Sequence, residues 1–207
     1  QTAGKWQRVE FTTGNAATLA APMGMTAATA STAIAGIRAG TLGGIDRSTA
    51  AFLTASAVVP SAGRPIVAFV GALDGMLHAI GISGSGVVPG RELWAFVPPS
   101  QLSRIGVFAA GVDAPPKLAD VFIDDLGTGV KRWRTVLAVT TGSYTGPVSL
   151  LDVTDPLAPR FLWQASVPSS GAYGMGGSRG AAVGTIRWQG QTRHVVLVTT
   201  NNTGTAG

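Results

Sequence analysis

Residues 67–97 read VAFVGALDGMLHAIGISGSGVVPGRELWAFV. An apolar run ends at Asp74-Gly75, a second begins directly after it, and a Gly/Ser/Pro-rich gap then leads to RELW at 91–94. Asp-Gly between β-forming runs favours a tight hairpin, because a primed turn needs positive φ at its central residues and glycine supplies it without steric cost. The stretch therefore predicts three consecutive antiparallel strands.

The pattern returns later in the chain. Its pieces recur in the same order: VLAV at 136–139, PVSLLDV at 147–153 and RFLW at 160–163. Trp94 and Trp163 stand 69 positions apart, as do Val67 and Val136, and a third copy opens with HVVLV at 194–198. Equal offsets at two places indicate a repeated structural unit.

Each unit begins with two strands that form a hairpin or are joined by a short connection, the first of which precedes the stretch described above. The expected strands are 50–59 and 65–73 in the first unit, 117–124 and 133–139 in the second, and 181–188 and 192–200 in the third. Tandem four-stranded antiparallel units are typical of β-propeller blades. We therefore expect an all-β chain with a quinoprotein-like arrangement of blades at about 48–98, 113–168 and 178–207, the last incomplete. Because propellers close with about four to eight blades, the chain is expected to hold an incomplete ring.

Residues 1–47 lack this pattern. Alternation from Lys5 to Gly14 predicts one strand, and the Ala/Thr/Gly-rich run that follows is expected to be extended or irregular. A helix over 26–39 is an alternative, although no strong cap or charge pattern supports it. A short helical turn is expected within 100–110.

The composition favours short strands and turns. Hydrophobic residues make up 45% and charged residues 12%, with 29 glycines, 12 prolines and no cysteine, so disulfides and thiolate sites are excluded. Despite a net charge of +5, the basic residues are dispersed, and the densest group, Lys131–Arg134, is interpreted as a solvated hairpin rim. We expect no nucleic-acid partner and no membrane span, since no apolar run reaches about 18 residues. A chain that begins at Gln1 is expected to be processed or part of a longer protein.

The polar residues at repeat positions predict structural roles. Asp74 and Asp152 are expected to make turn hydrogen bonds, and Asp124-Asp125 an exposed hairpin tip in preference to a cation site. His78 and His194 are distant in sequence and are expected to be structural.

No catalytic, cofactor or metal residue is assigned. Trp94 and Trp163 could stack on a quinone, but their shared repeat position favours a buried plug between blades. None of three serines considered as nucleophiles lies in a Gly-x-Ser-x-Gly motif: Ser103, Ser143 and Ser149.

Two segments, VGALDGMLHA at 70–79 and GRELWAFVP at 90–98, resemble the propeller domain of the PilY family of type IV pilus tip-associated adhesins. Further landmarks follow in the family's order: VDAPP at 112–116, WRTVL at 133–137, LDVTDP at 151–156 and Ser178-Arg179. The resemblance covers about 65–198. Gly81 stands where the repeat usually has aspartate, Gly180 replaces a proline, and the family's aspartate-rich calcium loop is not found in these 207 residues.

The resemblance implies an exported, non-catalytic adhesin and pilus assembly factor. It would act at the pilus tip, or in the periplasm before assembly, and bind minor pilins and host or abiotic surfaces. Calcium would enter elsewhere in the complete protein. Two alternatives share parts of the repeat: a quinone (PQQ)-dependent dehydrogenase and a scaffold like the BamB outer-membrane assembly lipoproteins.

Overall fold

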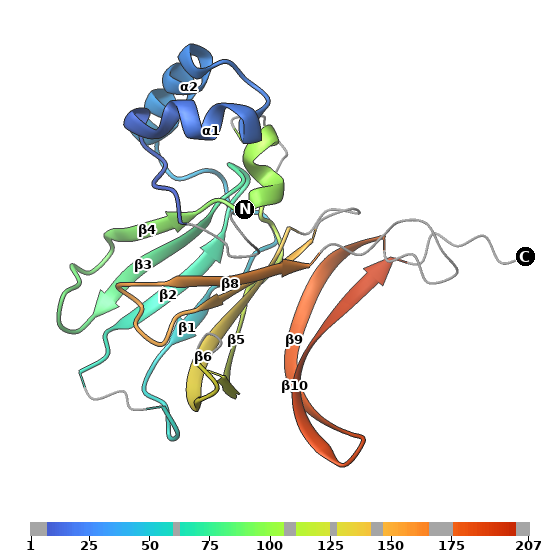
Figure 1. Ribbon diagram of the computed structural model, residues 1–207. Helices are drawn as coiled ribbons and strands as arrows, with labels where there is room; N and C mark the ends of the chain where they lie inside the picture. Colours follow the sequence, from blue (N-terminus) through green and yellow to red (C-terminus); the bar gives the residue numbers. More distant parts are fainter. Residues whose placement is uncertain are drawn as a thin grey trace, which may run out of the picture.

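The computed structural model describes residues 8–59, 63–105, 111–124, 128–141, 147–165 and 176–201, and these are mostly β. Two four-stranded antiparallel sheets and a two-stranded hairpin follow one another along the chain (Figure 1). Sheet 1 contains β1 (Ala51–Leu53), β2 (Ile66–Gly71), β3 (Leu77–Ser83) and β4 (Glu92–Phe96). Sheet 2 contains β5 (Lys117–Asp124), β6 (Lys131–Thr140), β7 (Val148–Asp152) and β8 (Arg160–Ala165). The hairpin contains β9 (Gly176–Trp188) and β10 (Gln191–Asn201).

The two sheets repeat each other in strand order and in register. Trp94 on β4 lies opposite Ala79 on β3, and Trp163 on β8 lies opposite Leu150 on β7. Directly after these pairs both ladders shift by one residue, so that Leu93 in sheet 1 and Leu162 in sheet 2 are extra residues in β-bulges. The repeat inferred from the sequence offsets is confirmed at the level of strand pairing.

Sheet 2 is covered on both faces. One face packs on sheet 1 around a cluster in which Phe69, Leu77, Leu137 and Val153 are fully buried. The other face packs on the β9–β10 hairpin. Figure 1 shows this order, with sheet 2 between sheet 1 and the hairpin. Both interfaces are formed by alternate side chains of the strands, because successive side chains point to opposite faces.

The N-terminal region is helical, so the expectation of extended or irregular structure is wrong. Its elements are the 3-10 turn η1 (Thr13–Asn15) and the helices α1 (Ala16–Met23) and α2 (Ala27–Ala39). Alanine has the highest helix propensity, and the Oγ1 of Thr26 caps α2 by accepting the Thr29 amide at 3.2 Å. The predicted all-β class therefore gives way to a mostly β one.

The strand predicted over 5–14 is also not observed in its described part. Residues 8–12 pair with no strand, and η1 follows them. The alternation of 5–14 indicated a strand, but the Thr12 carbonyl instead accepts the Asn15 amide at 3.0 Å and starts a helical turn. Residues 1–7 lie outside the described residues.

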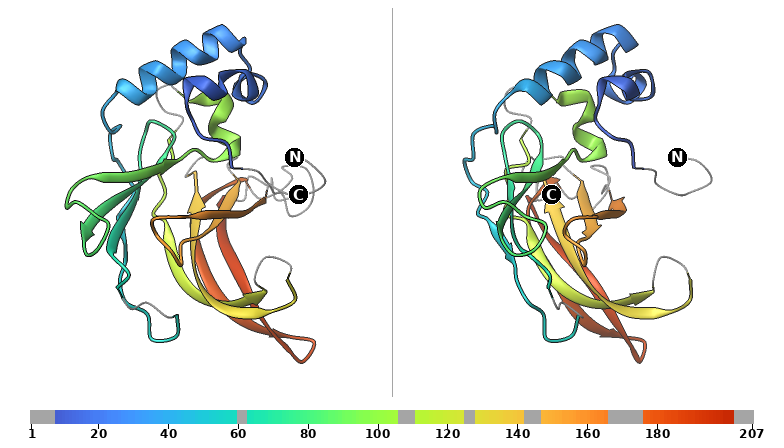
Figure 2. Two further views of the ribbon diagram at one scale, coloured as in Figure 1. Left: turned by 60° about the vertical axis from the view of Figure 1, so that its left-hand side comes forward. Right: turned by 90° about the vertical axis from the view of Figure 1, so that its left-hand side faces the viewer.

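The helices stack on one end of sheet 1 (Figure 2). They share a core with the 3-10 turn η2 (Pro99–Arg104), which confirms the helical turn predicted near residue 100. Met23 and Ile34 are buried there, and Met76 and Val97 extend the contact to the ends of β3 and β4.

Two local predictions need correction. The strand predicted over 50–59 ends at Leu53, because Ser56 accepts the amides of Val58 and Val59 through its Oγ at 3.1 and 2.9 Å and so forms a local turn. The Asp74-Gly75 hairpin is present, but only Gly75 has positive φ (90°). Its turn is a three-residue loop closed by the Ala72 carbonyl, which accepts the Gly75 amide at 3.3 Å.

Candidate functional site

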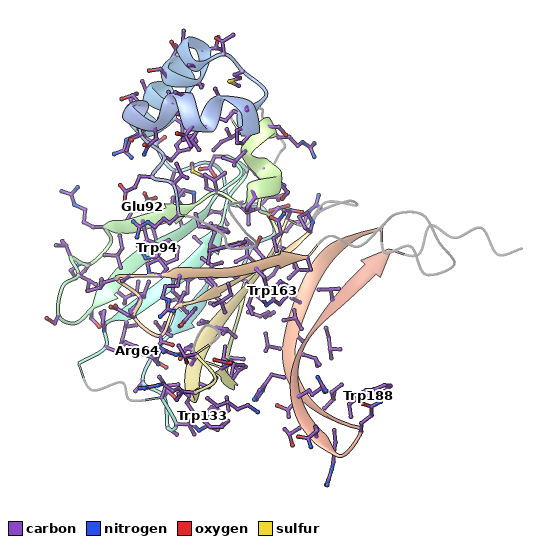
Figure 3. The ribbon with its side chains drawn as sticks, viewed as in Figure 1. Arg64, Glu92, Trp94, Trp133, Trp163 and Trp188 are labelled. Carbon is purple, nitrogen blue, oxygen red and sulfur yellow. The ribbon has the colours of Figure 1, made fainter. Side chains whose placement is uncertain are left out.

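The structure brings the candidate residues together where the sheets and helices meet. Trp94 lies on β4 and faces sheet 2 (Figure 3). Its ring centroid is 5.6 Å from that of Phe69, and its Nε1 donates to the carbonyl of Pro156 in the β7–β8 connection at 2.7 Å. The indole therefore links the two sheets through both packing and a hydrogen bond.

Trp163 occupies the equivalent place one sheet further on. It packs with Leu162 against the cluster between sheet 2 and the hairpin, as Leu93 and Trp94 pack against the cluster between sheets 1 and 2. The predicted plug between sheets is thus observed. The prediction that both tryptophans are buried is wrong: both are half-buried, because β4 and β8 are edge strands.

The repeated bulge explains why Leu and Trp are consecutive in the motif. In a regular strand, neighbouring side chains point to opposite faces, so only one of the two could reach an interface. A bulge places two residues opposite one and disrupts that alternation. With Leu93 as the extra residue in sheet 1 and Leu162 in sheet 2, both members of each Leu-Trp pair contact the same cluster.

His78 on β3 forms a cluster with two carboxylates. It is 2% exposed, and its Nδ1 lies 2.6 Å from Oε2 of Glu92 on β4. On the other side of the ring, Nε2 lies 3.1 Å from Oδ2 of Asp74 in the β2–β3 turn. Asp74 also accepts the Gly43 amide at 2.8 Å and the Met76 amide at 3.0 Å. The cluster therefore ties together β3, β4 and the connection between α2 and β1.

The surroundings shift both pKa values in the cluster. Burial on its own would lower the pKa of His78, but the hydrogen bonds and charges of Asp74 and Glu92 outweigh it, and the pKa of His78 is raised. Burial would raise the pKa of Asp74, yet the hydrogen bonds from His78 and from the Gly43 and Met76 amides, with the His78 charge, lower it. Both shifts favour the ionised pair.

A second polar network joins the two sheets. Thr135 on β6 donates its hydroxyl to Oδ1 of Asp120 on β5 at 2.7 Å and accepts Nη1 of Arg64 at 2.9 Å. Ser56 donates to the other oxygen of Asp120 at 2.6 Å, and Arg64 also donates to the carbonyl of Thr54. Arg64 and Ser56 both come from the connection between β1 and β2 in sheet 1, so the network fastens sheet 1 to sheet 2.

The aspartates singled out in the sequence hold turns. Oδ1 of Asp74 accepts the Met76 amide at 3.0 Å, and Oδ1 of Asp152, at a different position of the repeat, also accepts the amide two residues further on, that of Thr154, at 2.9 Å. Asp124 accepts the Gly129 amide at 3.0 Å at the β5–β6 tip. The turn hydrogen bonds predicted for Asp74 and Asp152 are confirmed, and Asp125 lies outside the described residues.

His194 belongs to β10, and its contacts are separate from those of His78. Its Nε2 accepts the Phe122 amide at 2.9 Å on the outer edge of sheet 2. Its ring also contacts Trp133, which pairs with Phe122 at a centroid distance of 5.5 Å. Next to Trp133, Lys131 and Arg132 are exposed at the rim.

The serines show no nucleophile geometry in the described part of the chain. Ser149 donates to the Gln164 side chain at 3.3 Å, Ser103 is exposed in η2, and Ser143 lies outside the described residues. The described part of the chain contains no group of three or more His, Cys, Asp or Glu side chains placed to hold a metal ion. Nor does it include a helix long and apolar enough to cross a membrane.

The sequence signals for these clusters differ in strength. Asp74 and His78 were each recognised as polar residues in the first hairpin, but their pairing with Glu92 was missed. Glu92 is a β4 residue 14 positions from His78, and only the strand register brings the two together. For Arg64, Asp120 and Thr135 the sequence offered no motif, because the network joins three unrelated segments.

The fold defines a class of mostly β proteins built from stacked four-stranded antiparallel sheets. Within that class, the chain is homologous over part of its length to the type IV pilus biogenesis factor PilY1. It is 34% identical over 137 residues to a PilY1 homolog of Xylella fastidiosa (strain Temecula1 / ATCC 700964), which covers 61% of this chain and 10% of the relative. It is 33% identical over 106 residues to PilY1 of Pseudomonas aeruginosa (strain UCBPP-PA14), covering 46% of this chain and 8% of the relative.

The crystal structure of the Pseudomonas aeruginosa PilY1 C-terminal domain is also similar. The TM-score is 0.48 at 27% sequence identity, over 65% of this chain and 24% of that one. No family model matches the sequence. The chain thus spans about a tenth of the length of the curated relatives it matches.

Proposed function

We propose that this chain is part of the β-propeller of a type IV pilus biogenesis factor and acts by binding, as a non-catalytic adhesin and assembly factor. The observation that carries the proposal is the partial homology to PilY1 proteins whose names state a role in type IV pilus biogenesis. Its partners would be minor pilins and, at the pilus tip, a host or abiotic surface. It would be exported, and would lie in the periplasm before assembly and at the cell surface afterwards.

The stacking of the sheets supports the propeller. Each interface uses the same Leu-Trp pair at the same bulge, so one sheet follows the next by a repeated operation. The outer face of the hairpin continues the pattern, with Ile186 41%, Trp188 58% and Leu197 59% exposed. A further blade would cover these side chains, as sheet 2 covers the inner face. Calcium, if the complete protein binds it, would be held by residues outside this chain.

A chimera tests the role in pilus assembly. The matching segment of Pseudomonas aeruginosa PilY1 would be replaced by residues 65–198 of this chain in a strain that lacks its own PilY1. We expect surface pili and twitching motility to return, because a homologous segment should restore the fold that the pilus machinery uses. A control chimera carrying Trp94→Ala and Trp163→Ala lacks both inter-sheet plugs and should restore neither. Stable, exported wild-type chimera without surface pili would contradict the proposal.

A second measurement separates this role from the alternatives. The same chimera, purified from the periplasm, would be examined by absorbance for a bound quinone and by affinity capture with purified minor pilins. We expect capture of minor pilins and no quinone band. A quinone band would favour the dehydrogenase, and capture of outer-membrane assembly proteins in place of pilins would favour the scaffold.

A further inference from the structure

The cluster around His78 can be complete in only one protonation state. Nδ1 and Nε2 each face a carboxylate oxygen, at 2.6 Å for Glu92 and 3.1 Å for Asp74. A neutral imidazole has one N–H donor and one acceptor nitrogen, whereas the imidazolium has two donors. While both carboxylates are ionised, both hydrogen bonds can therefore form at once only when His78 is charged.

The charged groups that face the ring, within the described residues, are these two carboxylates. Asp74 comes from the β2–β3 turn and Glu92 from β4. The cross-strand neighbours of His78, Val70 on β2 and Ala95 on β4, are uncharged. The connection after α2 supplies the Gly43 amide to Asp74, not a charge.

The two carboxylates are not held equally. Asp74 is 19% exposed at its side chain and is fixed by two backbone amides besides His78. Glu92 is 46% exposed at its side chain, and the contact with His78 is the bond that holds it inward. When the ring loses its proton, the tautomer with hydrogen on Nε2 keeps the bond to the anchored Asp74. The Nδ1 lone pair then faces the Glu92 carboxylate, which can turn into solvent.

We propose that His78 is a protonation-dependent clasp between β3 and β4, which holds Glu92 when the imidazole is charged and releases it when the imidazole is neutral. Glu92 is the first residue of β4, which pairs with β3 alone among the strands that the structure describes and so forms the edge of sheet 1. The same short strand carries Trp94, the link to sheet 2. Release of Glu92 would therefore loosen the strand that joins the two sheets. The raised pKa of His78 is consistent with this arrangement. The inference does not depend on the role in pilus assembly.

Hydrogen exchange and imidazole NMR on the 207-residue chain test the clasp. The His78 ring would be titrated by ¹⁵N spectra, and protection factors of the β4 amides would be measured over the same pH range, after correction for the intrinsic rate. We expect β4 protection to fall by about tenfold for each pKa unit that Glu92 contributes to His78, with its midpoint at the His78 titration. Protection of the buried residues Leu137 and Val139 on β6 reports the change in global stability over the same pH range, and the step in β4 is compared with it.

Three variants decide the outcome. Glu92→Gln should lower the pKa of His78 and remove the step in β4 protection, because no second carboxylate is left to release. His78→Gln should also remove the step, and His194→Gln, the matched control, should leave it unchanged. If His78→Gln does not fold, Glu92→Gln carries the test. A step that persists in Glu92→Gln, or a wild-type chain without a step at the His78 midpoint, would overturn the clasp.

Discussion

The indole Nε1 of Trp94 donates to the carbonyl of Pro156 at 2.7 Å, so a residue of sheet 1 is bonded to the backbone of sheet 2. The same indole packs on Phe69 inside its own sheet. A single side chain thus contributes to the core of one sheet and to its attachment to the next.

Trp94→Phe tests the hydrogen bond apart from the packing. The phenyl ring retains much of the contact with Phe69 but leaves the Pro156 carbonyl without this donor, so we expect a loss of about 1–2 kcal/mol in the free energy of unfolding. Urea denaturation followed by fluorescence measures it. Trp163→Phe is the matched control at the equivalent repeat position, and a smaller loss is expected there. Equal losses in the two variants would show that the hydrogen bond adds no stability.

The polar network between the sheets provides a second prediction. Thr135 is 3% exposed and connects Arg64 to Asp120 through its hydroxyl. Thr135→Val keeps the shape but leaves two polar groups short of a partner, at a cost of about 1–3 kcal/mol. The control is Thr185→Val, on an exposed residue of β9 whose hydroxyl contacts His194. If Thr135→Val is as stable as wild type in thermal unfolding, the network does not contribute to holding the two sheets together.

The stability of the chain should depend on pH through the His78 cluster. The pKa of His78 is raised on folding, so its contribution is complete below the unfolded value of about 6.5 and is lost as the pH rises through the folded value. The pKa of Asp74 is lowered, so its contribution is present above the unfolded value and is lost as the pH falls through the folded one. The free energy of unfolding should therefore decline both as the pH rises through the folded pKa of His78 and as it falls through the folded pKa of Asp74.

His78→Gln should flatten the alkaline decline because the group that titrates there is gone. His194→Gln again serves as the control. An alkaline decline of unchanged size in His78→Gln would assign it to other groups.

Gly81 tests how far the two sheets are equivalent. The strand register places Gly81 where sheet 2 has Asp152. A Cβ at Gly81 would lie 2.9 Å from the Cβ of Val87 and 3.1 Å from the carbonyl oxygen of Val88, so the β3–β4 connection occupies the space of a side chain. Gly81→Asp should therefore cost about 1–3 kcal/mol through overpacking, although sheet 2 has aspartate at the equivalent position.

Gly184→Ala is the control for that substitution, since nothing lies within 4 Å of a Cβ at Gly184 on β9. It should be neutral or slightly stabilising in the same unfolding measurement. A Gly81→Asp chain that unfolds like wild type would mean that the β3–β4 connection moves aside without cost.

The repeated sheets could be predicted because their information is local and occurs twice. The offset of 69 between Trp94 and Trp163 matches the observed register, including the bulge, which the sequence did not reveal. The alternative helix over 26–39 is borne out by α2, whereas α1 was missed, because alanine, threonine and glycine in 15–44 form no polar and apolar faces with charges to mark the helices. Their stability comes from packing on η2 and on the ends of β3 and β4, which lies outside any sequence window.

The candidate site was predicted residue by residue, not as an arrangement. The turn role of Asp74 followed from its place before Gly75. The contact between Asp74 and His78 depends on the three-residue loop, which the sequence did not reveal. Glu92 contacts His78 on the neighbouring strand, and Arg64 contacts Thr135 in the other sheet. The tertiary fold alone brings such pairs together.

The bulge in the fourth strand of each sheet has a consequence for which changes the chain can tolerate. As the extra residues, Leu93 and Leu162 each determine which face the side chains on either side of the bulge point to. Substitutions at these positions change only the quality of packing. Loss of one residue would restore regular alternation and turn Leu and Trp of the pair to opposite faces. Natural variation in these strands should therefore consist of exchanged side chains at constant length, with insertions and deletions confined to the connections.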